Sequence, residues 1–468
     1  MDDSCLWDPS DIFWAEWIMT TRMSNSYTLS RLVMCGAVVG AVACFSPAQP
    51  AFAQISYNRE PINYSSAVMT DPVARLQERI DTGETQLDFD ENHGYLKAVL
   101  DELKVLQSSQ SLVFSKTSFQ LRRISPRTPR AVYFSDDAYV GWVQHGDVVE
   151  LSAVDPQHGA VFYTLRQEET DRPKFVRDRG NCLVCHASSR TQGVPGHLVR
   201  SVYSSPSGMP NFGSGTFRTN HSSPLSQRWG GWYVSGTHGR QRHMGNVVTP
   251  DRSRPEEFDR EEGANVTDLA KRFDTSPYLT RDSDIVALMV LEHQTDMHNF
   301  ITYANFQCRL AQQNAEIMNR ALERPKDFVS DSTQRRIASA AEKLVRYTLF
   351  VDETELTDKI QGPSKFTESF ARLGPRDRKG RSLRQFDLSR RLFKYPCSYL
   401  IYSDAFRGLP KQIKDVVYRR LWEVLSGEDQ SEPFSHLSKD DRVAILDILR
   451  ETNCDVPDYF KGKKQPQR

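Results

Sequence analysis

The chain has 468 residues, and 60 Lys and Arg balance 60 Asp and Glu, so its formal net charge is zero. A balanced charge argues against nucleic acid or an anionic membrane surface as a partner, and we therefore expect no nucleic-acid binding. The length is that of two or three domains rather than one.

The first 53 residues predict an export signal. Residues 1–22 are acidic, contain Trp and resemble no targeting segment, so we expect translation to begin at Met23. Arg31 then gives a short positive region, residues 32–45 are apolar, and Ala51-Phe52-Ala53 is a small-residue cleavage site. This order of features is that of a secretory signal peptide.

Cleavage after Ala53 leaves a chain of about 415 residues that begins at Gln54. We therefore expect a periplasmic or secreted protein. Cys44 follows three small or apolar residues and offers lipoprotein anchoring as the minor alternative. The apolar run is too short to cross a bilayer and no other stretch is apolar enough, so we expect no integral membrane segment.

Helical and then β-rich patterns follow the signal segment. Residues 71–81 and 94–107 carry apolar side chains at helical spacing. Five short β-rich runs then alternate with turn residues, at 111–115, 131–134, 138–144, 148–154 and 160–165. Short strands joined by such turns predict an antiparallel meander.

The most informative stretch is Cys182-Leu183-Val184-Cys185-His186, a C-x-x-C-H motif. This spacing is the attachment signature of haem c. The two thiols add to the porphyrin vinyl groups, and the following histidine ligates the iron. These five residues resemble the motif of c-type cytochromes. The resemblance implies one covalent haem c with its iron, attached through Cys182 and Cys185, with His186 as the proximal ligand.

Two other chemistries use a C-x-x-C pair. A thioredoxin-like pair opens a helix after a buried strand, whereas the residues before Cys182 are charged and irregular. A structural zinc site needs a second Cys or His pair at short spacing, whereas the other cysteines after the signal segment are isolated, at positions 308, 397 and 454. The absence of a second C-x-x-C-H from the sequence counts against multihaem cytochromes and di-haem peroxidases.

A glycine-rich stretch at 213–246 follows the motif and gathers histidines, arginines and aromatic residues. Such residues can ligate iron, pair with haem propionates and cover a porphyrin face, so we expect this stretch to contribute to a haem pocket. The alternative is a glycine-rich strand pair with ordinary core aromatics.

The pattern becomes helical after a charged, Pro-bearing linker at 250–280. Asp282 or Ser283 can cap a long helix over 284–323. Further helices are expected at 334–350, 383–395, 411–425 and 438–450, the last with a capping box. We therefore predict an α+β protein: a β-rich haem c domain at 54–249, the linker, and a helical domain at 281–468.

The sixth iron ligand is the next question, because an occupied position suits electron transfer and an open one suits catalysis. We favour a histidine of the pair His238 and His243, then His293 on the apolar stripe of the long helix, then Met209 in a Gly-Met-Pro turn. His221 is a further candidate. For His293 alone, a buried and hydrogen-bonded core histidine is the stronger interpretation, and we expect the nearby Glu292 and Asp296 to lie on a solvated face.

Two functional hypotheses follow from these observations. The first is a monohaem c-type cytochrome that transfers electrons with a redox partner protein or a small-molecule donor or acceptor. The second is a haem c-dependent peroxidase or oxidase with an open distal site, in which Arg240, Arg242 or a distal histidine would polarise an O–O bond. We place electron transfer first, because the sequence contains a single haem motif.

Overall fold

The structure is a computed structural model, and it describes residues 57–250 and 253–461. The predicted signal peptide, the start at Met23 and the alternative anchor at Cys44 lie outside the described residues. The described residues all belong to one compact unit. None of the helices in these two ranges is both long enough and apolar enough to cross a membrane.

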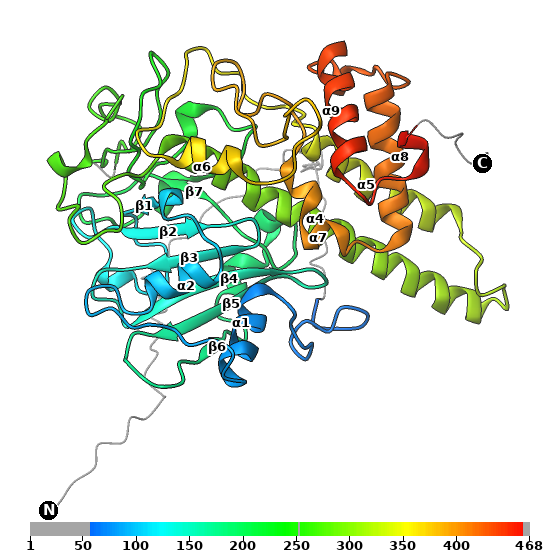
Figure 1. Ribbon diagram of the computed structural model, residues 1–468, viewed down its shortest axis with the longest axis horizontal. Coiled ribbons are helices and arrows are strands. Elements are labelled where there is room, and N and C mark those ends of the chain that lie inside the picture. Colours follow the sequence, from blue (N-terminus) through cyan, green and yellow to red (C-terminus); the bar gives the residue numbers. More distant parts are fainter. Residues whose placement is uncertain (1–56, 251–252, 462–468) are drawn as a thin grey trace, which may run out of the picture. The chain divides into compact units, whose positions relative to one another are not determined.

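The protein is α+β, as predicted, with a six-stranded sheet before a mainly helical half (Figure 1). The strands pair in chain order and each pair is antiparallel, so the predicted meander is confirmed. The sixth strand was not predicted, because Phe175–Arg177 is only three residues long. The sheet comprises β1 (Ser111–Val113), β2 (Arg130–Phe134), β3 (Ala138–Trp142), β4 (Val148–Asp155), β5 (Gly159–Arg166) and β6 (Phe175–Arg177).

The sheet has a hydrophobic core on each face, because successive side chains of a strand point to opposite sides. Tyr133 and Val140 pack into one core with α1 (Pro72–Asp81) and α2 (Leu96–Glu102). Phe134 and Tyr139, their neighbours in β2 and β3, pack into the other core with the long helix α4 (Ile285–Ala321). The sheet is therefore covered by helices on both faces.

The helical half is built outward from α4 (Figure 1). Helix α4 packs against α5 (Asp331–Thr348), α5 against α8 (Lys411–Ser426), and α8 against α9 (Lys439–Thr452). The predicted capping box at Ser438 and Asp441 begins α9. The remaining elements are the short helices α3 (Leu183–His186), α6 (Phe366–Arg372) and α7 (Asp404–Arg407) and the two-stranded sheet of β7 (Arg200–Val202) and β8 (Thr216–Arg218).

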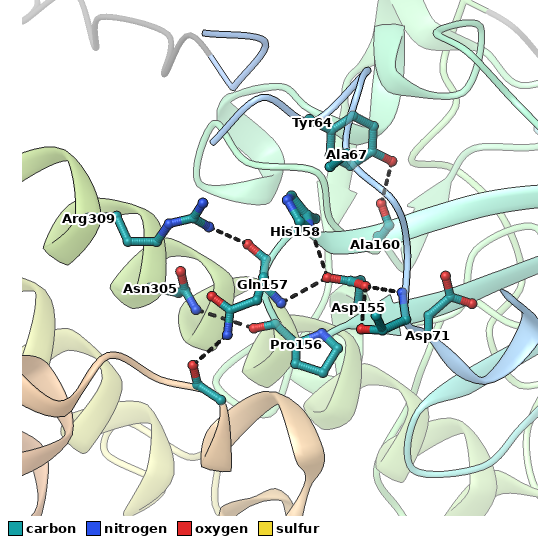
Figure 2. Close-up of polar contacts among 12 residues, drawn as sticks. Tyr64, Ala67, Asp71, Asp155, Pro156, Gln157, His158, Ala160, Asn305 and Arg309 are labelled. Atoms are coloured by element: carbon teal, nitrogen blue, oxygen red, sulfur yellow. Dashed lines mark hydrogen bonds and ion pairs between the residues drawn. The ribbon is translucent and has the colours of Figure 1, made fainter. Parts of the chain in front are cut away.

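The turn between β4 and β5 joins the sheet to α4 (Figure 2). The Asp155 carboxylate accepts hydrogen bonds from the backbone N–H groups of Thr70 and Gln157, at 2.7 and 2.9 Å. Asn305 and Arg309 of α4 donate to the carbonyl oxygens of Pro156 and Gln157. These contacts fix the sheet against the long helix at the start of β5.

Two predictions about the helical half are wrong. The cap of α4 is Asp284, whose carboxylate accepts from the backbone N–H groups of Val286 and Ala287, and not Asp282 or Ser283. Residues 383–395 form no helix. Asp387 instead accepts from the N–H groups of the two residues that follow Leu388, and a bridge between Phe386 and Phe393 closes the turn. A short acidic side chain that binds nearby N–H groups competes with helix formation in this way.

The segment 250–280 does more than connect the two halves. Leu269, Phe273 and Tyr278 are buried in the core that the sheet forms with α1 and α2. Phe273 stacks on Tyr233, with ring centroids 4.7 Å apart. The part of the chain whose composition predicts a linker therefore also supplies core residues.

Candidate haem site

The C-x-x-C-H motif forms a single helical turn, α3, at the surface beside β5. The carbonyl of Cys182 accepts from the backbone N–H groups of Cys185 and His186, at 3.2 and 2.9 Å. The Asp178 carboxylate accepts from the N–H groups of Gly180 and Cys182, both at 3.0 Å, and so organises the approach to the turn. Both thiols and the imidazole thus come from one short, hydrogen-bonded unit.

A small apolar core lies beneath this turn. Leu183, at the second position of the motif, is buried, while Val184 beside it is 80% exposed. The core also contains Ala187, Val194, Ala160 and Phe162 of β5, Phe306 of α4, and the N-terminal residues Ile62 and Tyr64. Leu183 thus anchors the turn in this core, and Cys182 packs partly buried against it.

His186 has one ring nitrogen bound and one available. Its Nδ1 lies 3.0 Å from the carbonyl oxygen of Gly196, and because a carbonyl only accepts, Nδ1 carries the proton. Nε2 therefore presents a lone pair. Burial lowers the pKa of His186, which favours the neutral ring that a metal requires. A backbone carbonyl that orients the far nitrogen is the usual support for a metal-binding histidine.

The two thiols do not resemble a redox-active dithiol. Burial, followed by the charges of Asp178 and Glu150, raises the pKa of the Cys182 thiol to about 12. A thioredoxin-like cysteine needs a lowered pKa, because the thiolate is the reactive form. Neither Cys182 nor Cys185 forms a disulfide. A Cys182 thiol that does not ionise readily suits alkylation by a bound porphyrin better than thiol exchange.

A half-buried ion pair borders the motif. Arg130 of β2 lies 2.8 Å from the carboxylate of Glu150 of β4, and both charges act on Cys182 and on His186. Gln120 donates to the same carboxylate at 3.2 Å. These contacts bring residues 116–130, the loop before β2 together with the first residue of β2, close to the motif.

The segments that approach the motif carry exposed apolar side chains. Besides Val184 they include Phe119 and Leu121, on either side of Gln120, and Phe212, whose ring lies under the guanidinium of Arg200 at 4.7 Å. Arg200 in turn lies within electrostatic range of Cys185. Phe119 is 71% exposed and Phe212 54%. Exposed apolar groups on neighbouring segments can form a binding surface for an apolar partner.

Met209 lies in the loop that carries Phe212. Its turn is closed by a hydrogen bond from the backbone N–H of Ser205 to the carbonyl of Met209, and the side chain is 44% exposed. Of the four predicted distal ligands, this one lies in the loop that reaches Arg200 beside the motif.

The histidine pair His238 and His243 lies in the interior. Nδ1 of His238 is 2.7 Å from the carbonyl of Gln241, and its Nε2 accepts from the N–H of Asn265, so both nitrogens are bound. Nδ1 of His243 accepts from the N–H of Gly245, and the ring packs against Trp229. His238 therefore uses both ring nitrogens in protein contacts, whereas Nε2 of His243 is buried and has no hydrogen-bond partner.

His293 forms a hydrogen-bonded pair with His221. Their Nδ1 atoms lie 2.9 Å apart, and Nε2 of His293 lies 2.8 Å from the Ser398 hydroxyl. Both rings stack between Tyr347 and Phe350. The interpretation of His293 as a buried, hydrogen-bonded core histidine is confirmed.

Glu292 and Asp296 do not lie on a solvated face, and that prediction is wrong. Both are buried. Arg228 lies 3.0 Å from Glu292, and Arg218 lies 2.7 Å from Asp296. Each carboxylate is neutralised by an arginine from the glycine-rich stretch, so these arginines serve the packing of that stretch on α4.

Other metal and cysteine chemistry finds little support in the described ranges. They contain no group of three or more His, Cys, Asp and Glu side chains placed to bind a metal ion. Cys308 and Cys397 are buried and Cys454 is exposed, and none of the three is in a disulfide. The zinc alternative thus has no set of protein ligands there, whereas haem iron needs only axial ligands from the protein.

Comparison of the chain with protein-family models, with curated protein sequences and with solved structures finds no match in any of the three. The site therefore has to be judged on its own geometry. Sequence reasoning missed Gly196 and Glu150, because each reaches the motif only through the fold. Asp178 could have been found, since an acidic residue a few positions before a helix is a common cap.

Proposed function

We propose that this protein is an exported monohaem c-type cytochrome that transfers electrons. The observation that carries the proposal is the state of His186, whose Nδ1 is fixed by the Gly196 carbonyl while Nε2 remains available beside two reduced cysteines. A bound haem c would supply an iron that cycles between two oxidation states. Cys182 and Cys185 would attach it, and His186 would be its proximal ligand.

The apolar surface around α3 supports this assignment. A porphyrin is flat and apolar over most of its area, and the exposed side chains of Val184, Phe119, Leu121 and Phe212 would offer it apolar contacts. Arg200 is a candidate to pair with a propionate, since its guanidinium lies over Phe212 and interacts electrostatically with Cys185. These side chains would exclude water from the iron and orient the group against the protein.

We place Met209 first among the distal candidates. Its thioether is partly exposed in the loop that reaches Arg200, whereas His238 and His293 use both ring nitrogens in protein hydrogen bonds. His243 has an unpartnered Nε2, but its ring is buried in the interior. Met209→Ala should convert a low-spin ferric spectrum to a high-spin one, and His243→Ala should leave the spectrum unchanged. An unchanged spin state in Met209→Ala would contradict Met209 as the distal ligand and would favour one of the histidines.

Absorption and electron paramagnetic resonance spectra separate electron transfer from the alternative, a haem c-dependent peroxidase or oxidase. A carrier should be low-spin in both oxidation states and should not respond to cyanide or peroxide. A high-spin iron that binds cyanide and turns over peroxide would favour the enzyme. Arg240 gives no support to the enzyme, because its side chain is 90% exposed and pairs with Asp358.

A basic loop beside the motif suggests the charge of the redox partner. Residues 116–130 contain five Lys and Arg and no Asp or Glu, although the whole chain is neutral. Arg130 and Arg123 pair with acidic neighbours, while Arg122 and Arg127 are exposed. We therefore propose an acidic partner, or a small anionic acceptor, that approaches over this loop.

Stopped-flow oxidation of the reduced protein tests the role of this loop. Ferricyanide, an anion, should react faster at low salt than at high salt, because opposite charges steer the encounter. The double substitution Arg122→Glu with Arg127→Glu should slow ferricyanide several-fold and should not slow a cationic ruthenium ammine oxidant. An equal change in the oxidation rates by the two oxidants would contradict electrostatic steering by this loop.

A further inference from the structure

A second candidate site lies where the loop 220–222 meets α4 and α5. It is a cavity of about 220 Å³, open to solvent on one side. Its walls come from three separate parts of the chain, and none of the lining residues belongs to the haem motif. The lining residues are Asn220, His221, Ser222, Phe300, Lys343, Arg346, Tyr347, Val351 and Asp352.

The floor of the cavity is aromatic and uncharged. The ring of Phe300 packs 4.6 Å from that of Tyr347, and the ring of His221 packs 4.2 Å from it on another side. Tyr347 and His221 are both buried. Burial lowers the pKa of His221 to about 3, so the imidazole is neutral at physiological pH. A flat apolar body would find contact with these rings.

One wall carries two cations a turn apart on α5. Lys343 and Arg346 are three residues apart, so both side chains lie on the same face of the helix. Arg346 meets only a solvent-exposed partner, because Asp352 lies 3.6 Å away and is 76% exposed. Lys343 lies over the ring of Tyr303, 3.4 Å from its hydroxyl. Such surface contacts are weak, so both cations can turn to a ligand.

The mouth of the cavity is shaped by a strained turn. Phe350 and Asp352 adopt φ values of 57° and 63°, a left-handed conformation that is rare for residues with a bulky side chain. Stacking of Phe350 on His221 and His293 stabilises this turn. Backbone strain of this kind gathers at ligand sites. Here it brings Val351 and Asp352 to the cavity, with Asp352 beside Arg346.

We propose that this cavity binds a small carboxylate with a flat apolar body. The carboxylate would lie against Lys343 and Arg346, and the apolar body against Phe300 and Tyr347. The size fits, because a 150 Å³ protein cavity holds benzene and this one measures about 220 Å³. The proposal does not depend on haem attachment, since no group of the motif lines the cavity.

Isothermal titration calorimetry with benzoate, benzamide and benzylamine tests the charge requirement. Benzoate should bind at least about tenfold more tightly than its neutral isostere benzamide, because a carboxylate gains charged hydrogen bonds. Benzylamine should bind no better than benzamide. Equal affinity for benzoate and benzamide, or no detectable binding of benzoate, would overturn the proposal.

Substitutions on α5 locate the bound probe. Arg346→Ala and Lys343→Ala should each weaken benzoate binding about fivefold or more. Arg335→Ala is the matched control, because Arg335 is exposed on the same helix and does not line the cavity. Loss of binding in the control, or unchanged binding in both cavity variants, would place the probe elsewhere and contradict the proposal.

Discussion

Gly196 controls the candidate iron ligand through its backbone and lacks room for a side chain. Its carbonyl accepts the His186 Nδ1 hydrogen bond. A Cβ atom added at Gly196 would lie 2.1 Å from Oδ1 of Asn299 and 3.1 Å from Cβ of Thr191. Asn299 has no freedom to move away, because it is buried and bonds to His197 in both directions.

We therefore predict that Gly196→Ala destabilises the protein by about 2 kcal/mol, the usual size of an overpacking effect. Urea denaturation measures the change. Gly213→Ala is the control, because its added Cβ would approach only Asn211, at 3.7 Å. A loss below 0.5 kcal/mol in Gly196→Ala, similar to a surface substitution, would show that the loop adapts and that His186 is less firmly placed.

At this scale the sequence predicts the motif better than its surroundings. The spacing of Cys182, Cys185 and His186 defines a chemical unit without any knowledge of the fold. The distal ligand has no such spacing. Whether His238 or His293 has a ring nitrogen available to ligate iron depends on hydrogen-bond partners such as Asn265 and Ser398, which lie far away in the sequence.

Asp284, the N-cap of α4, stabilises the helix that packs against both the sheet and the helical half. Asp284 accepts from two helical N–H groups and also from the backbone and hydroxyl of Ser364. Asp284→Ala should cost about 2 kcal/mol, near the upper limit for an N-cap, because the site is buried. Ser438→Ala, at the exposed cap of α9, should cost about 1 kcal/mol. Thermal denaturation of both variants tests whether Asp284→Ala is the more destabilising of the two.

The β4–β5 turn should make stability depend on acid pH. Burial alone would raise the pKa of Asp155, but hydrogen bonds from His158, Thr70 and Gln157 outweigh it and hold the pKa at about 2. The unfolded chain has an ordinary Asp pKa of about 3.9. The ionised carboxylate therefore stabilises the fold above about pH 4, and that contribution, about 2 kcal/mol, is lost as the pH falls toward 2.

Asp155→Asn tests this assignment to the turn. The variant should be less stable than the parent at pH 5, and its stability should fall less between pH 4 and pH 2. Asp147→Asn is the control, because Asp147 is 76% exposed and pairs only at the surface with Arg123. The same acid dependence in Asp155→Asn and in the parent would contradict the assignment.

Elements with strong local patterns were predictable, and those decided by local competition were not. The meander and the helices α5, α8 and α9 follow from periodicity and capping. Residues 383–395 have apolar residues at helical spacing too, but Asp387 binds nearby N–H groups and Leu388 adopts a φ of 60°. Periodicity alone cannot show that a side chain will compete for the backbone in this way.

The whole molecule should unfold as one unit, because α4 shares a core with the sheet. Val113, Phe134, Tyr139 and Val154 of the sheet pack in the same cluster as the helical half. Calorimetry should therefore give one cooperative transition. Residues 57–280 and 281–461, expressed separately, should not fold. Two transitions, or a folded fragment, would favour separate domains close to the boundaries that composition predicts.

Covalent attachment of haem is the central claim, and intact-protein mass spectrometry tests it most directly. The protein should be exported by a host that attaches haem c in its periplasm. We predict a mass equal to the processed chain plus one haem, and the mass of the chain alone when Cys182 and Cys185 are both replaced by Ala. A chain without haem, or haem retained by the double variant, would contradict the account.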